Sequence, residues 1–203
     1  MDDSVLRAMA KWPNVPAVYG WLSLDRRGNW LIKRESISND ALNAFISRNY
    51  LHDGMGRWFF QNGPQRVFVD LDCTPFVYRV TNAVDAPLAL TTHIGDEVNA
   101  IHGAWLDELG TVLIDTDRGA GIVHDQDLDP LLLASIMDAN SKVVEENLLD
   151  ELLEFIEPQR PIPLWLKFRE NLVRFEPIRA ADVPKRFGFD LKPFDPDSPS
   201  PKS

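Results

Sequence analysis

Two His and two carboxylate side chains fall close together in this sequence, and their types could do chemistry. They are His93, Asp96, Glu97 and His102. Imidazole and carboxylate groups together suit zinc or iron, so one hypothesis is a metal-dependent hydrolase. Their spacing, however, matches neither the helical His-Glu-x-x-His of metalloproteases nor a facial triad. The sequence favours the alternative, a turn at Gly95–Asp96 with His side chains that are exposed or hydrogen-bonded.

A second group of residues is polar and lies between two apolar runs. It consists of Gln61, Asn62, Gln65 and Arg66, beside Trp58. Amide and guanidinium groups donate hydrogen bonds, and Arg adds a charge that suits an anion. One interpretation is a hairpin loop with exposed polar tips. The other is a recognition edge for a small anion or a peptide.

Motifs for established catalytic sites are missing from the sequence. There is no nucleophile elbow, phosphate-binding loop or dinucleotide fingerprint, so no cofactor and no catalytic residue are predicted. The single cysteine, Cys73, has no His near it in sequence and is typical of a small buried residue. These observations favour a non-catalytic module that binds a small ligand or a protein, with a regulatory role, over the metal-dependent hydrolase.

Composition limits the class of protein. Of 203 residues, 44% are hydrophobic and six are Trp, which is enough for a folded core. The net charge of −10 argues against nucleic acid and against an anionic membrane surface as partners. The first residues are acidic, and no apolar run approaches the roughly 20 residues of a membrane helix. We therefore expect a soluble cytoplasmic protein, while its oligomeric state stays open.

The aromatic-rich stretch Arg57–Val80 organises the predicted fold. It holds three runs of aromatic and β-branched residues that alternate in period two and are separated by turn residues. This pattern predicts an antiparallel meander with its rings turned inward. Further hairpins are predicted over 19–33, 110–123 and 164–176, and a strand over 88–92. Helices are predicted over 4–11, from Ser38 or Asn39 to Leu51, from Asp129 through Met137, over 141–156 and over 180–187.

These elements indicate an α+β fold in which helices cover antiparallel sheets. We predict an N-terminal half over residues 1–92, a C-terminal half over 93–189 and a disordered Pro/Ser tail over 190–203. Gly28, Leu42 and Phe45 recur at a constant offset as Gly119, Leu133 and Ile136. This offset raises the hypothesis of a repeated hairpin–helix unit, with coincidence as the alternative.

Several longer strings resemble known families. The segments Lys11–Pro16, Tyr19–Leu22 and Arg57–Val67 are similar to an uncharacterised bacterial family, domain of unknown function 2946. More remotely, Thr74–Val77 and Gly95–Val98 resemble domain of unknown function 1285. The second resemblance implies an α+β fold with repeated motifs and a role in signalling. Neither resemblance implies a catalytic residue.

Overall fold

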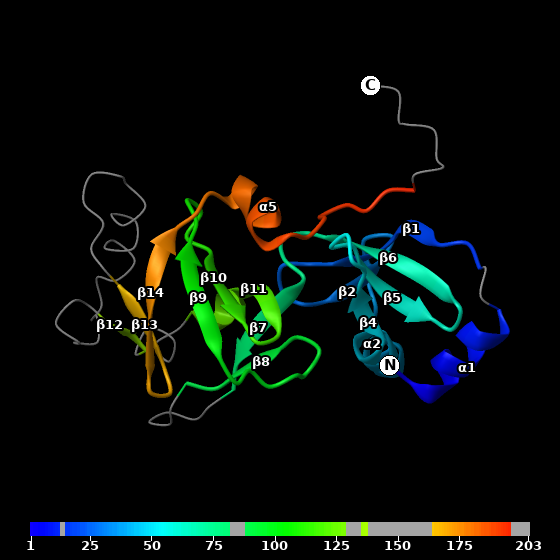
Figure 1. The fold of residues 1–203 in the computed structure, drawn as a ribbon, viewed down its shortest axis with the longest axis horizontal. Helices are drawn as coiled ribbons and strands as arrows, with labels where there is room; N and C mark the ends of the chain where they lie inside the picture. The colour runs from blue at the N-terminus through cyan, green and yellow to red at the C-terminus, as the bar shows by residue number, and fades with distance from the viewer. Residues whose placement is uncertain (13–14, 82–87, 129–134, 138–163, 196–203) are drawn as a thin grey trace, which may run out of the picture. The chain divides into compact units, whose positions relative to one another are not determined.

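Residues 1–12, 15–81, 88–128, 135–137 and 164–195 are described by the computed structural model of the chain (Figure 1). Their contacts divide the chain into two units. The first comprises Met1–Pro75 and Gly188–Ser203, and the second comprises Phe76–Phe187. The chain thus returns to its first unit after the second. The boundary predicted from the sequence, at residue 92, falls within the second of these units.

The first unit is built on a six-stranded mixed sheet in the order β3-β2-β1-β6-β5-β4. Its strands are β1 (Val18–Leu24), β2 (Trp30–Ile32), β3 (Glu35–Ser36), β4 (Tyr50–His52), β5 (Trp58–Asn62) and β6 (Gln65–Leu71). The hairpins β1–β2 and β5–β6 confirm the predictions made from alternation and turn residues. The two hairpins join where β1 and β6 pair in parallel. The rings of Phe59, Phe60 and Phe68 are buried, as predicted.

Two short helices belong to the first unit. Helix α2 (Asp40–Arg48) begins after Asn39, whose side-chain Oδ1 accepts a hydrogen bond from the Leu42 amide at 3.0 Å. The helix ends before the predicted Leu51 because the chain enters β4, which pairs with β5. Helix α1 (Asp3–Lys11) agrees with its prediction and buries Val5.

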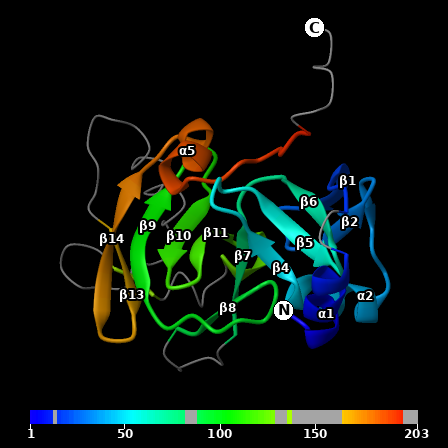
Figure 2. The same cartoon turned by 45° about the vertical axis from the view of Figure 1, so that its right-hand side comes forward.

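The second unit is built on an eight-stranded mixed sheet in the order β12-β13-β14-β9-β10-β11-β7-β8. Its strands are β7 (Phe76–Val80), β8 (Leu90–Thr92), β9 (Ile101–Leu106), β10 (Val112–Thr116), β11 (Gly119–Val123), β12 (Ile136–Met137), β13 (Trp165–Phe168) and β14 (Asn171–Pro177). Figure 2 shows β14, β9, β10 and β11 side by side. The hairpins β10–β11 and β13–β14 confirm their predictions.

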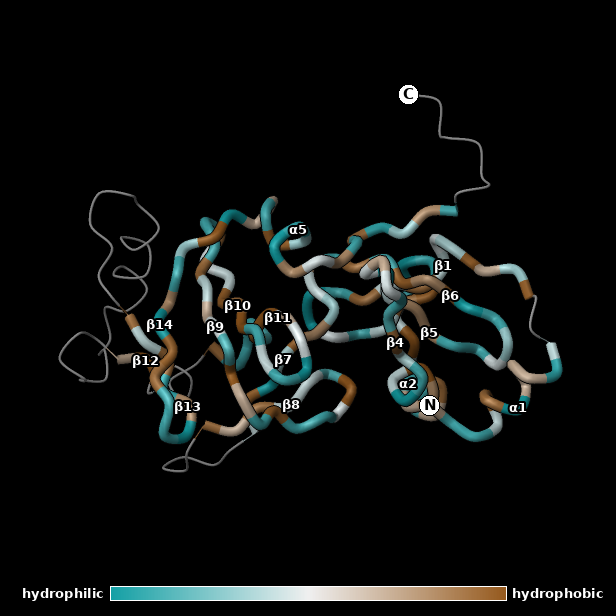
Figure 3. The backbone as a smooth tube through the Cα atoms, in the orientation of Figure 1, coloured by the Kyte–Doolittle hydropathy of each residue, from teal (hydrophilic) through white to brown (hydrophobic). Residues whose placement is uncertain are grey.

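Hydrophobic residues concentrate along the middle strands of this second sheet, β10 and β11 (Figure 3). Leu113, Ile114 and Ile122 are each almost fully buried. The described residues of this unit also form short 3₁₀ turns, η1 (Asp125–Asp127) and η2 (Ala180–Asp182), and the helix α5 (Val183–Phe187). The last two fall where a short helix was predicted. None of the described helices is long and apolar enough to cross a membrane.

The predicted antiparallel meander over Arg57–Val80 is wrong for its third strand. β5 and β6 pair with each other, but β7 pairs with β11 and β8 in the other sheet. Parallel pairing also joins β1 to β6 and β9 to β14. The sheets are therefore mixed and not antiparallel as predicted. Alternation indicates that a segment is a strand, but a parallel partner is distant in sequence and leaves no local turn signal.

The helix predicted from Asp129 is also wrong at its far end. Ile136 and Met137 form the strand β12, in which Ile136 is buried opposite Leu166 of β13. Residues 129–134 and the acidic helix predicted over 141–156 lie outside the described residues. The hairpins of the proposed repeat fall at corresponding positions, but Ile136, the counterpart of helical Phe45, is in a strand. The repeated hairpin–helix unit is therefore not confirmed.

The C-terminal segment from Gly188 bonds to the first unit. The Asp190 amide donates to the Gly56 carbonyl at 3.1 Å, and the Leu71 amide at the end of β6 donates to the Leu191 carbonyl at 2.8 Å. Asp190 and Leu191, predicted as part of a disordered tail, thus have defined backbone partners. Residues 196–203 of that predicted tail lie outside the described residues.

Candidate ligand-binding cavity

A cavity of about 450 Å³ lies on one face of the sheet in the first unit, under helix α2. Strands β1, β2, β5 and β6 form its floor. Most of the side chains that line it are apolar and two are amides. They are Val18, Trp21, Leu22, Ile32, Leu42, Phe45, Ile46, Phe60, Asn62, Gln65 and Val67. A volume of this size falls within the ~300–1,000 Å³ of small-molecule sites, which are mostly apolar with a few convergent polar groups.

Helix α2 forms the roof of the cavity because its apolar residues follow helical spacing. Leu42, Phe45 and Ile46 lie on one face of the helix and all line the cavity. The Phe45 ring meets the Phe60 ring edge to face, with the centroids 5.4 Å apart. The helix is also held by Trp30, whose Nε1 donates to Ser47 Oγ at 3.1 Å. The roof is therefore fixed to β2 and β5 while the space between remains open.

An irregularity in β1 gives the cavity its half-exposed aromatic side chain. Between the pairs Val18–Val67 and Leu22–Val69, β1 advances four residues while β6 advances two. Gly20 supplies the positive φ of +67° in this bulge. As a result the consecutive residues Trp21 and Leu22 both line the cavity. Trp21 remains 51% exposed.

The pleat of the β5–β6 hairpin divides the predicted ligand-binding residues between two faces. Asn62 and Gln65 form a cross-strand pair and line the cavity together. Gln61 and Arg66 form the neighbouring pair, and they point to the opposite face because successive side chains alternate. The predicted edge is therefore not one surface. Only its Asn62 and Gln65 belong to the cavity.

The remaining members of the predicted edge have structural contacts. Gln61 is 1% exposed, and its Nε2 donates to the carbonyls of Gly63 at 2.8 Å and Gln65 at 3.3 Å, which holds the hairpin turn. The Arg66 guanidinium lies 4.7 Å from the centre of the Phe59 ring. Trp58 packs on Tyr50, with ring centroids 4.7 Å apart, and is not a lining residue.

A basic turn that the sequence analysis did not single out lies beside the cavity. Lys33 and Arg34 connect β2 to β3, and both have positive φ, 50° and 69°. Two-residue hairpin turns with positive φ at both positions favour Asn-Gly, because side chains with a Cβ are strained there by about 1–2 kcal/mol per residue. The sequence signal for this turn was weak: only two residues separate Ile32 from Glu35, and neither of them is the glycine that marks such turns.

The two basic side chains of this turn contact different groups. The Lys33 Nζ lies 4.2 Å from the centre of the Trp21 ring. The Arg34 Nη1 donates to the Asp72 Oδ1 at 2.6 Å, and this hydrogen bond raises the pKa of Arg34 above its ordinary value. Arg34 is thus paired with a carboxylate, while Lys33 covers an aromatic residue of the cavity wall.

The predicted metal cluster is not assembled as a ligand set. Asp96, Glu97 and His102 are exposed, and His102 lies in the strand β9, which was not predicted. The His93 Nδ1 accepts a hydrogen bond from the Val77 amide at 3.3 Å. Within the described part of the chain, which includes all four residues, no group of three or more His, Cys, Asp or Glu side chains could hold a metal ion.

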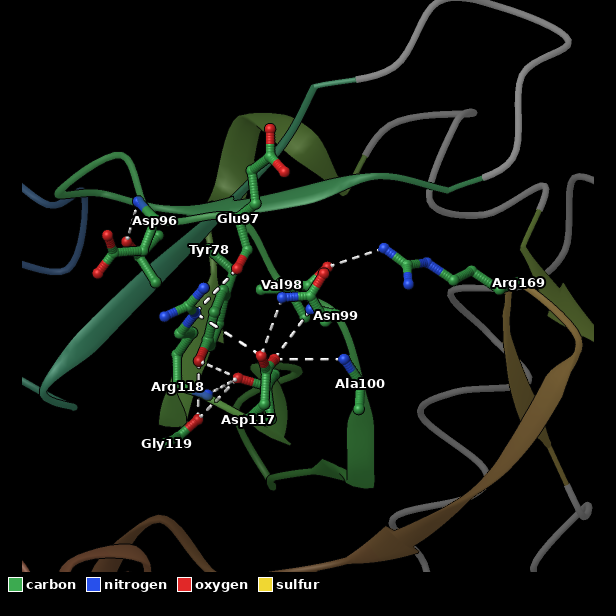
Figure 4. Close-up of polar contacts among 12 residues, drawn as sticks. Tyr78, Asp96, Glu97, Val98, Asn99, Ala100, Asp117, Arg118, Gly119 and Arg169 are labelled. Atoms are coloured by element: carbon green, nitrogen blue, oxygen red, sulfur yellow. Dashed lines mark hydrogen bonds and ion pairs between the residues drawn. The ribbon is translucent and has the colours of Figure 1, made fainter.

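The loop that carries these residues is instead fixed by Asp117 at the β10–β11 turn (Figure 4). The Asp117 carboxylate accepts hydrogen bonds from the amides of Asn99 at 2.9 Å and Ala100 at 3.2 Å. Arg118 Nε donates to the Glu97 carbonyl at 2.9 Å. Burial raises the pKa of Asp117, but the hydrogen bonds from Asn99 and Ala100 outweigh it and the pKa is lowered. These side-chain contacts to backbone groups hold the loop to the β10–β11 turn.

Comparisons with known proteins give the family and the fold. A solved structure of a DUF1285 family protein from Silicibacter pomeroyi DSS-3 is similar with a TM-score of 0.50 at 14% identity, over 90% of this chain and 99% of that chain. A DUF1285 family protein from Shewanella baltica OS155 gives a TM-score of 0.39 at 16% identity, over 52% of this chain and 84% of that chain. At 14% identity the likeness to the Silicibacter pomeroyi structure concerns the fold alone. No curated protein matches the chain.

The family model identifies the chain itself. The model of the family DUF2944, described as "Protein of unknown function (DUF2946)", matches residues 1–194. The resemblance carried by Arg57–Val67 is therefore confirmed, and the chain belongs to this family of proteins of unknown function.

Proposed function

We propose that the protein is a ligand-binding module whose first unit holds a small, largely apolar molecule in the cavity under α2. The observation that carries this proposal is the cavity itself, of about 450 Å³, with apolar walls and two amides. Asn62 and Gln65 are the polar groups that would orient the ligand, since amides both donate and accept hydrogen bonds. Gln65 Nε2 already donates to the Pro16 carbonyl at 3.1 Å, which leaves its Oε1 and its second N–H for a ligand.

The composition of the wall supports binding over catalysis. None of the lining side chains is acidic, basic, a thiol or a hydroxyl. General acid–base and nucleophilic catalysis need such groups within reach of the substrate. A cytoplasmic location and a regulatory role, both expected from the sequence, remain part of this proposal. The helix predicted over 141–156 lies outside the described residues and takes no part in this proposal.

The test is a binding titration with an uncharged apolar fluorescent probe, N-phenyl-1-naphthylamine. We expect saturable binding by the wild type and loss of binding in Leu42→Trp, because an indole at this position fills the cavity under the roof helix. Ala44→Trp is the matched control, since Ala44 is an exposed residue of the same helix that does not line the cavity. Equal binding by both variants, with both folded by circular dichroism, would refute the proposed site.

A further inference from the structure

The basic turn Lys33–Arg34 and the turn after Asn62 follow strands that run in the same direction in the first sheet. β1 and β6 run in parallel, so Val18 and Gln65 begin their strands at one end. β2 and β5 run antiparallel to these neighbours, so they finish toward that end. The turn after β2 and the turn after β5 therefore point the same way along the sheet. β2 ends opposite Leu22, which is level with Val69 of β6, and β5 ends opposite Gln65.

Lys33 does not line the cavity, but its ammonium lies on one of the lining side chains. Its Nζ lies 4.2 Å from the centre of the Trp21 ring, and Trp21 and the adjacent Ile32 both line the cavity. The backbone bond from the Lys33 amide to the Trp21 carbonyl, at 2.8 Å, fixes the turn against the bulge of β1. The other cation of the turn, Arg34, is already paired with Asp72. The Lys33 ammonium thus lies beside the half-exposed Trp21, where the uncharged cavity wall meets solvent.

The turn holds Lys33 and Arg34 in a backbone conformation that these residue types disfavour. Both residues adopt positive φ, which Asn and Gly adopt more readily than Lys and Arg. Strained backbone of this kind occurs often at ligand-binding positions. In a chain with a net charge of −10, an anion also needs a local cation to be held.

We propose that the ligand of this cavity is a single-chain amphiphile with an anionic head, such as a fatty acid, and that Lys33 binds the head. This inference rests on the proposed function of the cavity. The hydrocarbon chain lies against the apolar wall under α2, and the carboxylate lies at the Lys33 ammonium beside Trp21. A volume of about 450 Å³ suits one chain of a small molecule and not a two-chain membrane lipid.

The experiment compares octanoate with 1-octanol, which share a chain and differ in the charge of the head, by isothermal titration calorimetry above pH 7. We expect the wild type to bind octanoate more tightly than octanol. Lys33→Gln should weaken octanoate binding about fivefold, as expected for one partly exposed ion pair, and leave octanol binding unchanged. Lys167→Gln, an exposed lysine of the second unit, is the control and should change neither.

The outcomes separate this inference from the proposed function. Equal affinities for octanoate and octanol, or an unchanged octanoate affinity in Lys33→Gln, overturn the anionic head and leave the apolar cavity in place. If neither octanoate nor octanol binds while N-phenyl-1-naphthylamine still does, the amphiphile is likewise overturned and the apolar cavity remains. Failure of the uncharged probe as well removes the proposed function and this inference together. Binding only to vesicles of an anionic two-chain phospholipid overturns the single-chain ligand.

Discussion

The Trp105 indole lies over Gly103, two residues earlier on the same face of β9. A Cβ added to Gly103 would overlap the ring, with Trp105 Cζ3 2.7 Å away. Two further groups lie near the indole: the Phe187 ring, whose centroid is 5.0 Å away, and the Arg186 guanidinium at 5.1 Å. The indole therefore occupies the space that a side chain at position 103 would need.

Gly103→Ala should destabilise the second unit by about 2 kcal/mol, because the added methyl group forces the indole from its packed position. The measurement is urea unfolding followed by circular dichroism, with Trp fluorescence reporting the environment of Trp105. Gly54→Ala is the control, since a Cβ at Gly54 meets nothing within 4 Å. A Gly103→Ala protein as stable as this control would contradict the packing described.

Asn39→Ala should destabilise the roof helix of the cavity by about 1 kcal/mol, because its Oδ1 caps the Leu42 amide. The sequence left Ser38 and Asn39 as alternatives for this cap. The structure assigns the cap to Asn39, so Ser38→Ala should change the unfolding free energy by much less. Unfolding in urea measures both. A larger effect from Ser38→Ala would show that the cap is wrongly assigned.

Gly20→Ala should cost about 1–2 kcal/mol, although a Cβ at this position has no neighbour within 4 Å. The reason is the positive φ of the β1 bulge and not steric contact. Gly20→Asn should cost less than Gly20→Ala, since Asn tolerates left-handed backbone better. Thermal melting of the two variants checks this order. Equal losses would indicate that the backbone conformation is not the cause.

Asp117 should make the stability of the second unit depend on acid pH. Its pKa is lowered in the folded state, so the carboxylate stabilises the fold above its ordinary pKa of about 3.9, and this contribution is lost as pH falls through the lowered value. Asp117→Asn should therefore lower the melting temperature at pH 7, and the difference from wild type should shrink toward about pH 3.

The control for Asp117 is Asp96→Asn, which removes an exposed carboxylate from the neighbouring loop. Melting curves of both variants are collected between pH 7 and about pH 3, and only Asp117→Asn removes the carboxylate that accepts from the Asn99 and Ala100 amides. A difference for Asp117→Asn that stays constant over the same range would mean that its hydrogen bonds, and not its charge, account for the effect.

The sequence could have shown which residues of β5 and β6 share a face with the cavity, but it could not have shown where the cavity forms. The period-two pattern of β5 and β6 indicates which residues share a face, and it would have separated Gln61 and Arg66 from Asn62 and Gln65. What the pattern does not show is the bulge around Gly20, because its four-against-two register exists only between paired strands. The contact between Lys33 and Trp21 depends on that bulge.

Local chemistry in the sequence determined the hairpins, the buried aromatic rings and the helix that begins after Asn39. These features depend on neighbours within a few residues, so alternation, turn residues and caps suffice to predict them. Tertiary structure alone decided which hairpins share a sheet. The parallel pairs β1–β6, β7–β11 and β9–β14 join segments far apart in the chain, and their energy comes from packing that no short segment contains.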